Sequence, residues 1–208
     1  MNTKVAVIDY GMGNLHSIGK ALEHVGAEVR ITARREVVMA ADRVVFPGVG
    51  AMRDCMGALV RSDLTEVVKE AAVAKPFLGI CLGMQAMLDR SEENDGVDCL
   101  GLIPGEVRHF DQHPETMDLK IPHMGWNHVR SRTNHPMWTG IDQDARFYFV
   151  HSYYARPREP AHVAGTTAYG IEFTSVSARD NLFASQFHPE KSQQAGLRLL
   201  TNFLTWNP

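Results

Sequence analysis

Short apolar runs alternate with amphipathic stretches through the first half of the chain. Residues 4–9 have the near-continuous apolar character of a buried strand. Apolar residues then recur at helical spacing over 15–25, and Gly26 predicts the end of that helix. The other elements expected in this half are strands at 29–32, 43–46 and 77–80, a helix at 59–74 and a helix that begins at Cys81. Such alternation predicts a parallel sheet covered by helices on both faces.

The second half has a different pattern. Strand-like sequence dominates after about residue 100, and the chain closes with an amphipathic helix. The expected strands are 105–110, 147–153, 163–169 and 182–187, and the expected helix is 192–206. The polar stretch 90–98 is predicted to be a surface loop. We therefore expect an α/β fold, with a mixed, largely parallel sheet and an antiparallel extension, in a single domain over residues 1–208.

Composition and charge narrow the function classes. The 208 residues are 44% hydrophobic and 22% charged, as in ordinary globular proteins, and the formal net charge of −3 offers no basic surface for nucleic acid. The sequence contains no run of 18 apolar residues and begins without a signal-peptide pattern. We expect a cytoplasmic protein that binds neither nucleic acid nor a membrane.

The cysteines and histidines do not indicate a metal site. Cys55, Cys81 and Cys99 are odd in number and far apart, which fits neither a disulfide framework nor a metal-binding pair. Most of the ten histidines, His123 among them, lie in polar sequence without the i, i+4 spacing of helical metal ligands. We expect no metal and no cofactor.

Cys81 is the strongest candidate for chemistry. It is the centre of a Gly-Ile-Cys-Leu-Gly run at 79–83, between a predicted strand and a predicted helix. A thiol on such a turn projects from the sheet, and the helix N-terminus favours its thiolate form. The amide of Leu82 is then free to face a developing oxyanion. Taken alone, the same run is equally compatible with a tight turn that holds a buried cysteine.

Two further motifs support the functional interpretation. The run Pro-Gly-Val-Gly at 47–50 follows a predicted strand, and its glycines allow a backbone amide to approach a ligand. Alone it would be an ordinary glycine-rich turn. His188 and Glu190 are two residues apart, so in extended chain they project to one side, where the carboxylate can orient the imidazole. A cysteine, a histidine base and a carboxylate together indicate acyl transfer.

These residues resemble the class I glutamine amidotransferase family, whose cysteine, histidine and glutamate match Cys81, His188 and Glu190. The resemblance spans the whole chain and implies a flavodoxin-like α/β fold. It also implies a mechanism without a cofactor. Cys81 attacks the side-chain amide of glutamine, ammonia leaves, and water hydrolyses the glutamyl thioester while His188 transfers the proton.

The resemblance implies roles for the residues around the nucleophile as well. The oxyanion hole would use the backbone at Leu82, Val49 and Gly50, and the amide at Val49 would have to turn first. Low basal turnover is therefore expected. The implied glutamine-binding residues are Gly48, Gly50, Gln85, Ser152 and Tyr153.

Within the family, several blocks resemble the glutaminase subunits of imidazole glycerol phosphate synthases, the enzymes that act in histidine biosynthesis. These blocks are residues 9–15, 47–50, 79–85, 101–105, 122–127 and 147–153. This resemblance implies a heterodimer with a cyclase subunit, a (β/α)₈ barrel that consumes the ammonia. The segment 111–118 has no function assigned from the sequence.

A partner-facing surface follows from the same resemblance. It would include Asn14, Trp126, Tyr148 and Lys191, because aromatic anchors and a lysine suit an interface. Trp126 and Tyr148 are also compatible with ordinary core positions.

Two alternatives remain open. One is the glutaminase subunit of another amidotransferase, such as that of anthranilate, carbamoyl phosphate, GMP or pyridoxal phosphate synthesis. Several of those subunits have histidine at the position of Met84, which counts against this alternative. The other is a non-catalytic paralogue that docks on a partner, and the intact cysteine, histidine and glutamate argue against it.

Overall fold

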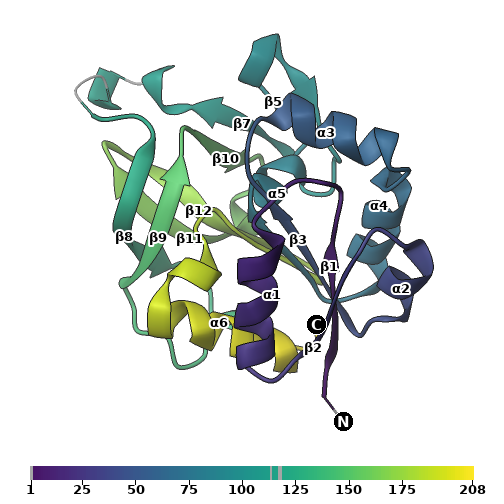
Figure 1. Cartoon of the computed structure of the whole chain (residues 1–208). Coiled ribbons are helices and arrows are strands. Elements are labelled where there is room, and N and C mark those ends of the chain that lie inside the picture. The colour runs from purple at the N-terminus through teal and green to yellow at the C-terminus, as the bar shows by residue number, and fades with distance from the viewer. Residues whose placement is uncertain (1, 113, 117–118) are drawn as a thin grey trace.

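The computed structural model describes residues 2–112, 114–116 and 119–208, in which a mixed sheet is flanked by helices (Figure 1). Its first half is parallel, in the spatial order β2, β1, β3, β4, β13. These strands are β1 (Lys4–Ile8), β2 (Glu28–Thr32), β3 (Arg43–Gly48), β4 (Phe77–Cys81) and β13 (Leu182–Ser185). The last of them joins the parallel set from the far end of the chain.

The second half of the sheet is mainly antiparallel. The order continues from β13 through β12, β10, β7, β5 and β6, while β11, β8 and β9 branch from β12. The strands are β5 (Arg90–Ser91), β6 (Val97–Asp98), β7 (Gly105–His109), β8 (His123–Ser131), β9 (Ala145–His151), β10 (Tyr153–Pro157), β11 (Val163–Tyr169) and β12 (Ile171–Arg179). The mixed α/β sheet with an antiparallel extension is confirmed.

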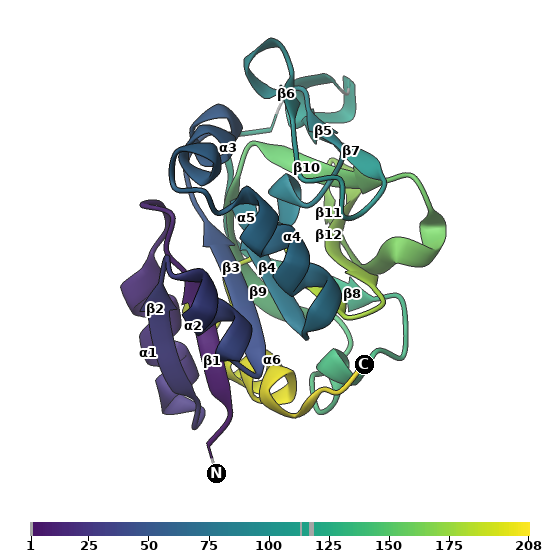
Figure 2. The same cartoon turned by 90° about the vertical axis from the view of Figure 1, so that its right-hand side faces the viewer.

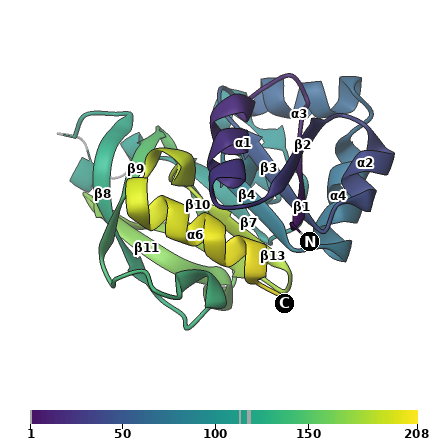
Figure 3. The same ribbon diagram turned by 60° about the horizontal axis from the view of Figure 1, so that its bottom comes forward.

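Helices cover both faces of the parallel half. Side chains of β1 point alternately to the two faces of the sheet. Val5 and Val7 pack with the helices α1 (Leu15–His24) and α6 (Gln193–Thr205), whereas Ala6 and Ile8 pack on the opposite face. Figure 2 shows α4 and α5 in front of the sheet, and Figure 3 shows α1 and α6 on its other face. The helices are α1 (Leu15–His24), α2 (Arg35–Ala40), α3 (Met52–Arg61), α4 (Thr65–Ala74), α5 (Leu82–Ala86) and α6 (Gln193–Thr205).

Several predicted boundaries were wrong. The helix expected at 59–74 is two helices, because the chain turns at Asp63, whose φ of 54° is incompatible with a continuous helix. The strand expected at 147–153 is divided between β9 and β10 at Ser152. The stretch 90–98, expected as a loop, contains β5, β6 and the 3₁₀ turn η1 (Glu93–Asp95).

The sequence also did not predict α2, β8 and β12. Short 3₁₀ turns connect other elements, namely η2 (Phe110–Gln112), η3 (Pro114–Thr116), η4 (Pro136–Trp138), η5 (Pro160–His162) and η6 (Pro189–Lys191). Of the segment 111–118, residues 113, 117 and 118 lie outside the described residues.

Candidate active site

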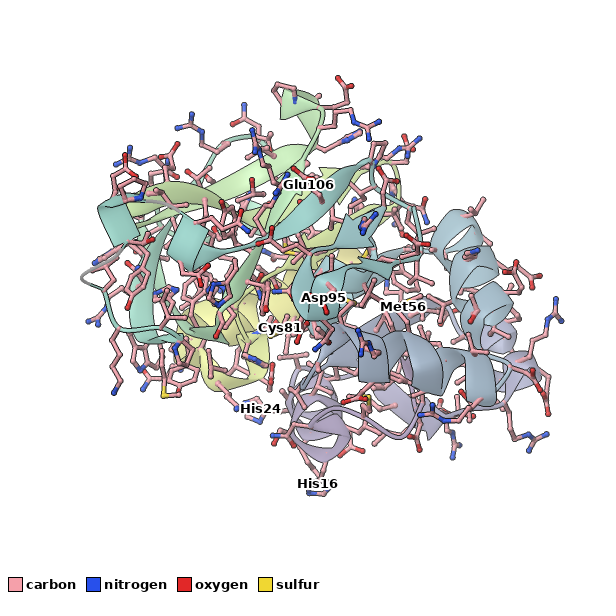
Figure 4. All side chains as sticks on the ribbon, turned by 90° about the horizontal axis from the view of Figure 1, so that it is seen from above. His16, His24, Met56, Cys81, Asp95 and Glu106 are labelled. Atoms are coloured by element: carbon pink, nitrogen blue, oxygen red, sulfur yellow. The ribbon has the colours of Figure 1, made fainter. Side chains whose placement is uncertain are left out.

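Cys81 occupies a strained turn between β4 and α5. Its φ of 55° and ψ of −112° are unusual for a residue with a side chain, and such strain is often found where a side chain must be presented for function. Close packing maintains the turn. A side chain at Gly83 would overlap the Phe46 carbonyl oxygen, and one at Gly79 would lie 2.6 Å from the Met87 sulfur. In Figure 4, Cys81 lies between the half with the antiparallel strands and the half with α3.

His188 reaches the same place from the neighbouring strand. β13 pairs in parallel with β4, with Ser185 opposite Ile80, so the chain segments that follow the two strands leave the sheet at the same edge. His188 Nδ1 lies 2.9 Å from Glu190 Oε1, and the side chains of both residues are only 3% exposed. Within the described residues, His188 Nε2 makes no hydrogen bond. One ring nitrogen is therefore held by the carboxylate and the other is left for the thiol.

The electrostatics of His188 favour its charged form. Burial lowers the pKa of His188, but interactions with Cys81 and Glu190 outweigh burial and raise that pKa to about 10. Contacts with the Cys81 sulfur and the Glu190 carboxyl group thus favour the protonated form of the imidazole. The arrangement is suited to holding a proton on His188 beside the Cys81 sulfur.

A cavity of about 330 Å³ opens in front of the thiol, a size that suits a small ligand. Eight of the predicted site residues line it: Val49, Gly50, Cys81, Leu82, Gln85, Ser152, Tyr153 and His188. Gly48 packs behind this surface, where an added side chain would lie 2.7 Å from the Tyr10 hydroxyl oxygen. The motifs that are distant in sequence thus meet at one cavity.

Several polar residues at the cavity or beside the Cys81 sulfur were not predicted as site residues from the sequence. Gln186 is fully buried, and its side-chain amide donates to the Cys81 sulfur at 3.7 Å. Glu93 and His151 line the cavity. Glu93 lies in an expected loop, where no sequence pattern distinguished it. Gln186 lies in an expected strand, and its polar side chain within the mainly apolar run 182–187 was a signal that could have identified it.

The other two thiols are poorly suited to nucleophilic chemistry. Burial raises the pKa of Cys55 to about 11 and that of Cys99 to about 12. Cys55 donates to the Tyr10 hydroxyl at 3.6 Å. A high pKa keeps these thiols protonated at neutral pH, so Cys81 is the candidate nucleophile among the three cysteines.

The residues expected at a partner interface lie in two places. Trp126 on β8 and Tyr148 on β9 are cross-strand partners with ring centroids 6.2 Å apart, and the Lys191 ammonium lies 5.8 Å from the Tyr148 ring. Trp126 is 37% exposed, which excludes a core position. Asn14 caps α1, since its side chain accepts from the Ser17 amide at 3.3 Å, and α1 packs on η6, which contains Lys191.

The described part of the chain contains neither a metal-binding cluster nor a membrane-spanning helix. No group of three or more histidine, cysteine or acidic side chains there could hold a metal ion. Among the same residues, no helix is both long and apolar enough to cross a bilayer.

Comparison with known proteins places this geometry in a family. The family model described as "Glutamine amidotransferase class-I" matches residues 6–206. "Imidazole glycerol phosphate synthase subunit HisH" of Methylococcus capsulatus is 60% identical over 215 residues, which cover 99% of this chain and 98% of that protein. The protein of the same name from Acinetobacter baylyi is 56% identical over 206 residues, which cover 99% of each.

Solved structures agree on the fold. A putative GMP synthase protein from Thermoplasma acidophilum has a TM-score of 0.73 at 19% identity, with 99% of this chain and 94% of that chain covered. PurLQS from Thermotoga maritima gives a TM-score of 0.72 at 16% identity, with 99% of each chain covered. With a family model that matches nearly the whole length and relatives above half identity, the chain belongs to the class I glutamine amidotransferases.

Proposed function

We propose that this chain is the glutaminase subunit of an imidazole glycerol phosphate synthase, which hydrolyses glutamine and supplies ammonia for histidine biosynthesis. The observation that carries the proposal is the buried Cys81–His188–Glu190 arrangement at the end of a cavity sized for an amino acid. The name and full-length similarity of the relatives support the particular synthase. The continuous sheet supports a single domain over 1–208.

The reaction begins with the thiolate. Cys81 Sγ attacks the side-chain carbonyl carbon of glutamine, and the proton held on His188 Nε2 passes to the departing nitrogen, so that ammonia leaves and a thioester forms. Water then attacks the thioester while His188 accepts its proton. The thiolate leaves as glutamate is released, and the ion pair is restored. Glu190 orients the imidazole throughout and stabilises its positive charge.

Backbone amides would stabilise the oxyanion in both steps. Leu82, the first residue of α5, presents one donor, and the 48–50 segment the other. Each donor contributes about 3 kcal/mol in comparable sites. Val49 is 39% exposed and precedes Gly50, whose φ is 100°, so this segment can turn its amide without disturbing the core. That freedom supports a low-activity state relieved by the partner.

Polar groups at the cavity suit the rest of the glutamine molecule. The two hydrogens of the Gln85 amide bond to the Tyr153 carbonyl at 2.8 Å and to Gln186 at 2.9 Å, so its oxygen is left to accept from the substrate. Glu93 offers a carboxylate for the α-ammonium group. The backbone at Ser152 and Tyr153 completes the cavity wall.

Ammonia is useful only if it reaches a second active site before water protonates it, so a cyclase subunit is the proposed partner. The surface that would contact it contains the cluster of Trp126, Tyr148 and Lys191, in which the two rings meet edge to face, and the Asn14 cap. The Tyr148 carbonyl accepts from the His188 amide at 3.0 Å, which ties this surface to the base. A cytoplasmic location is proposed, because a reduced Cys81 is required and the three cysteines are unpaired.

Glutamate release by the purified chain tests the proposal. It is measured alone and with a cyclase subunit plus its phosphoribulosyl ligand, with Cys81→Ala as the inactive variant and Cys99→Ala as the matched control. Activity should appear or rise sharply only in the complex, vanish in Cys81→Ala and persist in Cys99→Ala. If the cyclase changes nothing while the chain hydrolyses glutamine, another amidotransferase partner is correct. If no condition gives turnover and a glutamine analogue does not alkylate Cys81, the docking paralogue is correct.

A further inference from the structure

Two buried histidines lie at the cavity, where His151 forms part of the wall and His123 contacts His151. His123 on β8 and His151 on β9 are cross-strand partners that are only 4% and 6% exposed. His123 Nδ1 lies 2.9 Å from His151 Nε2. Their surroundings are aromatic: His123 stacks on Tyr169 with ring centroids 4.1 Å apart, and His151 lies 5.2 Å from the Phe173 ring. A polar pair in such a place must satisfy its own hydrogen bonds.

A donor at one end, the Asn127 amide, and an acceptor at the other, the Tyr153 carbonyl, fix the direction of every bond in this pair. The Asn127 side-chain nitrogen lies 3.1 Å from His123 Nε2, and because an amide nitrogen only donates, His123 Nε2 accepts. His123 therefore carries its hydrogen on Nδ1 and donates it to His151 Nε2. His151 in turn carries its hydrogen on Nδ1 and donates to the Tyr153 carbonyl at 2.8 Å.

Both histidines are neutral in this arrangement, as their surroundings require. Burial lowers the pKa of His123 to about 4. Burial also lowers the pKa of His151 to about 3, with further lowering by His123 and His188. The pair is thus a fixed set of hydrogen bonds at neutral pH rather than a proton store.

The hydrogen bonds continue from Tyr153 to the nucleophile. The same carbonyl that accepts from His151 accepts from Gln85 at 2.8 Å, and Gln85 donates to Gln186 at 2.9 Å. Gln186 donates to the Cys81 sulfur at 3.7 Å. A continuous series of hydrogen bonds, which passes through the Tyr153 backbone carbonyl, therefore connects β8 with the Cys81 sulfur.

We propose that Asn127, His123 and His151 are positioning residues, which hold the Tyr153 carbonyl in place and thereby hold Gln85 and Gln186 against Cys81. The inference deepens the proposed function and rests on it for the identity of the substrate. The series of hydrogen bonds transfers no proton, because each nitrogen of the pair already has its partner.

Two substitutions of His151 separate positioning from mere packing. In His151→Asn, the side-chain N–H lies near the position of the imidazole Nδ1 and preserves the hydrogen bond to the Tyr153 carbonyl. In His151→Leu, the side chain fills the aromatic pocket but makes no hydrogen bond. Positioning predicts that iodoacetamide alkylates Cys81 at least tenfold more slowly in His151→Leu and within about threefold of wild type in His151→Asn. Packing predicts the reverse order, because an apolar side chain suits these surroundings better. The exposed His128→Asn on the same strand should leave the rate unchanged.

A second variant and a spectroscopic signature keep the test decisive if His151→Leu does not fold. His123→Asn should preserve the bond to His151 but lose the one to Asn127, with an intermediate rate. Nitrogen NMR of the wild-type chain should report the Nδ1–H tautomer for both histidines. An Nε2–H tautomer in either, or faster alkylation in His151→Leu than in His151→Asn, would overturn the proposal. Neither readout needs glutamine or a partner, so they stand apart from a failure of the glutaminase assay.

Discussion

Replacement of Glu190 by Gln isolates the charge of the carboxylate from its hydrogen bond. The variant retains an oxygen that can accept from His188 Nδ1, at a site where the wild-type pair is 2.9 Å apart. Glutamine and glutamate side chains are of nearly equal size, so the buried residues around position 190 need little rearrangement. What changes is the stabilisation of a protonated imidazole, and the pKa of His188 should fall from about 10 toward its ordinary value.

The size of the effect follows from burial. Both side chains are 3% exposed, so water screens the pair little. A hydrogen bond to a charged group contributes about 1.5–3 kcal/mol and one between neutral groups about 0.5–1.5 kcal/mol, so loss of the charge alone should cost about 1–1.5 kcal/mol. Since 1.4 kcal/mol is a factor of ten, the expected loss in kcat/KM for glutamine hydrolysis is about 5- to 12-fold. The same factor should appear in the alkylation of Cys81 near neutral pH, because less imidazolium stabilises less thiolate.

The assay is the rate of iodoacetamide alkylation between pH 5 and 10, together with glutaminase turnover in the complex. The variant should reach its full alkylation rate at a higher pH than wild type. Glu66→Gln is the matched control, because Glu66 is 83% exposed and pairs only with Lys69 on the surface of α4. Equal alkylation rates in Glu190→Gln and wild type across this range would refute the assignment of Glu190 as the stabiliser of His188.

Three further outcomes are expected. Gly83→Ala should lower stability by about 1–3 kcal/mol in urea unfolding and reduce alkylation of the nucleophile, since the new methyl group overlaps the backbone of β3. Trp126→Ala should weaken binding of the cyclase in titration calorimetry by at least tenfold and leave alkylation of the isolated chain unchanged, as befits an exposed aromatic anchor. Stability should fall as the pH drops from about 6.5 toward 4, because His123 and His151 have lowered pKa values in the folded chain and the unfolded chain therefore binds more protons. Urea unfolding midpoints measured over this pH range should fall less in His123→Asn than in wild type.

The sequence was informative where chemistry depends on neighbours in the chain. Cys81 sits on a local strand-to-helix turn, and Glu190 follows His188 closely, so both patterns could be recognised without knowledge of the sheet. The alternation of apolar runs likewise predicted the parallel half, because strands such as β3 and β4 are buried on both faces.

Contacts made by long-range strand pairing could not be predicted in this way. Gln186 meets Gln85 only because β13 lies beside β4, and His123 meets His151 only through the register of β8 and β9. β8 itself was missed because most of its residues are polar or partly exposed, so its sequence resembles a loop. Glu93 reaches the cavity from a 3₁₀ turn that has no periodic signal.

The adjacency of β4 and β13 also has a consequence for biosynthesis of the chain. The strand that presents the sulfur is complete long before the strand that precedes His188 is synthesised. The pairing of the two strands has a large sequence separation, with α5 and β5–β12 between them, and such non-local contacts are slow to form. A nascent or prematurely terminated chain consequently has the cysteine without its base. Glutamine is thereby protected from hydrolysis by fragments that could deliver the ammonia nowhere.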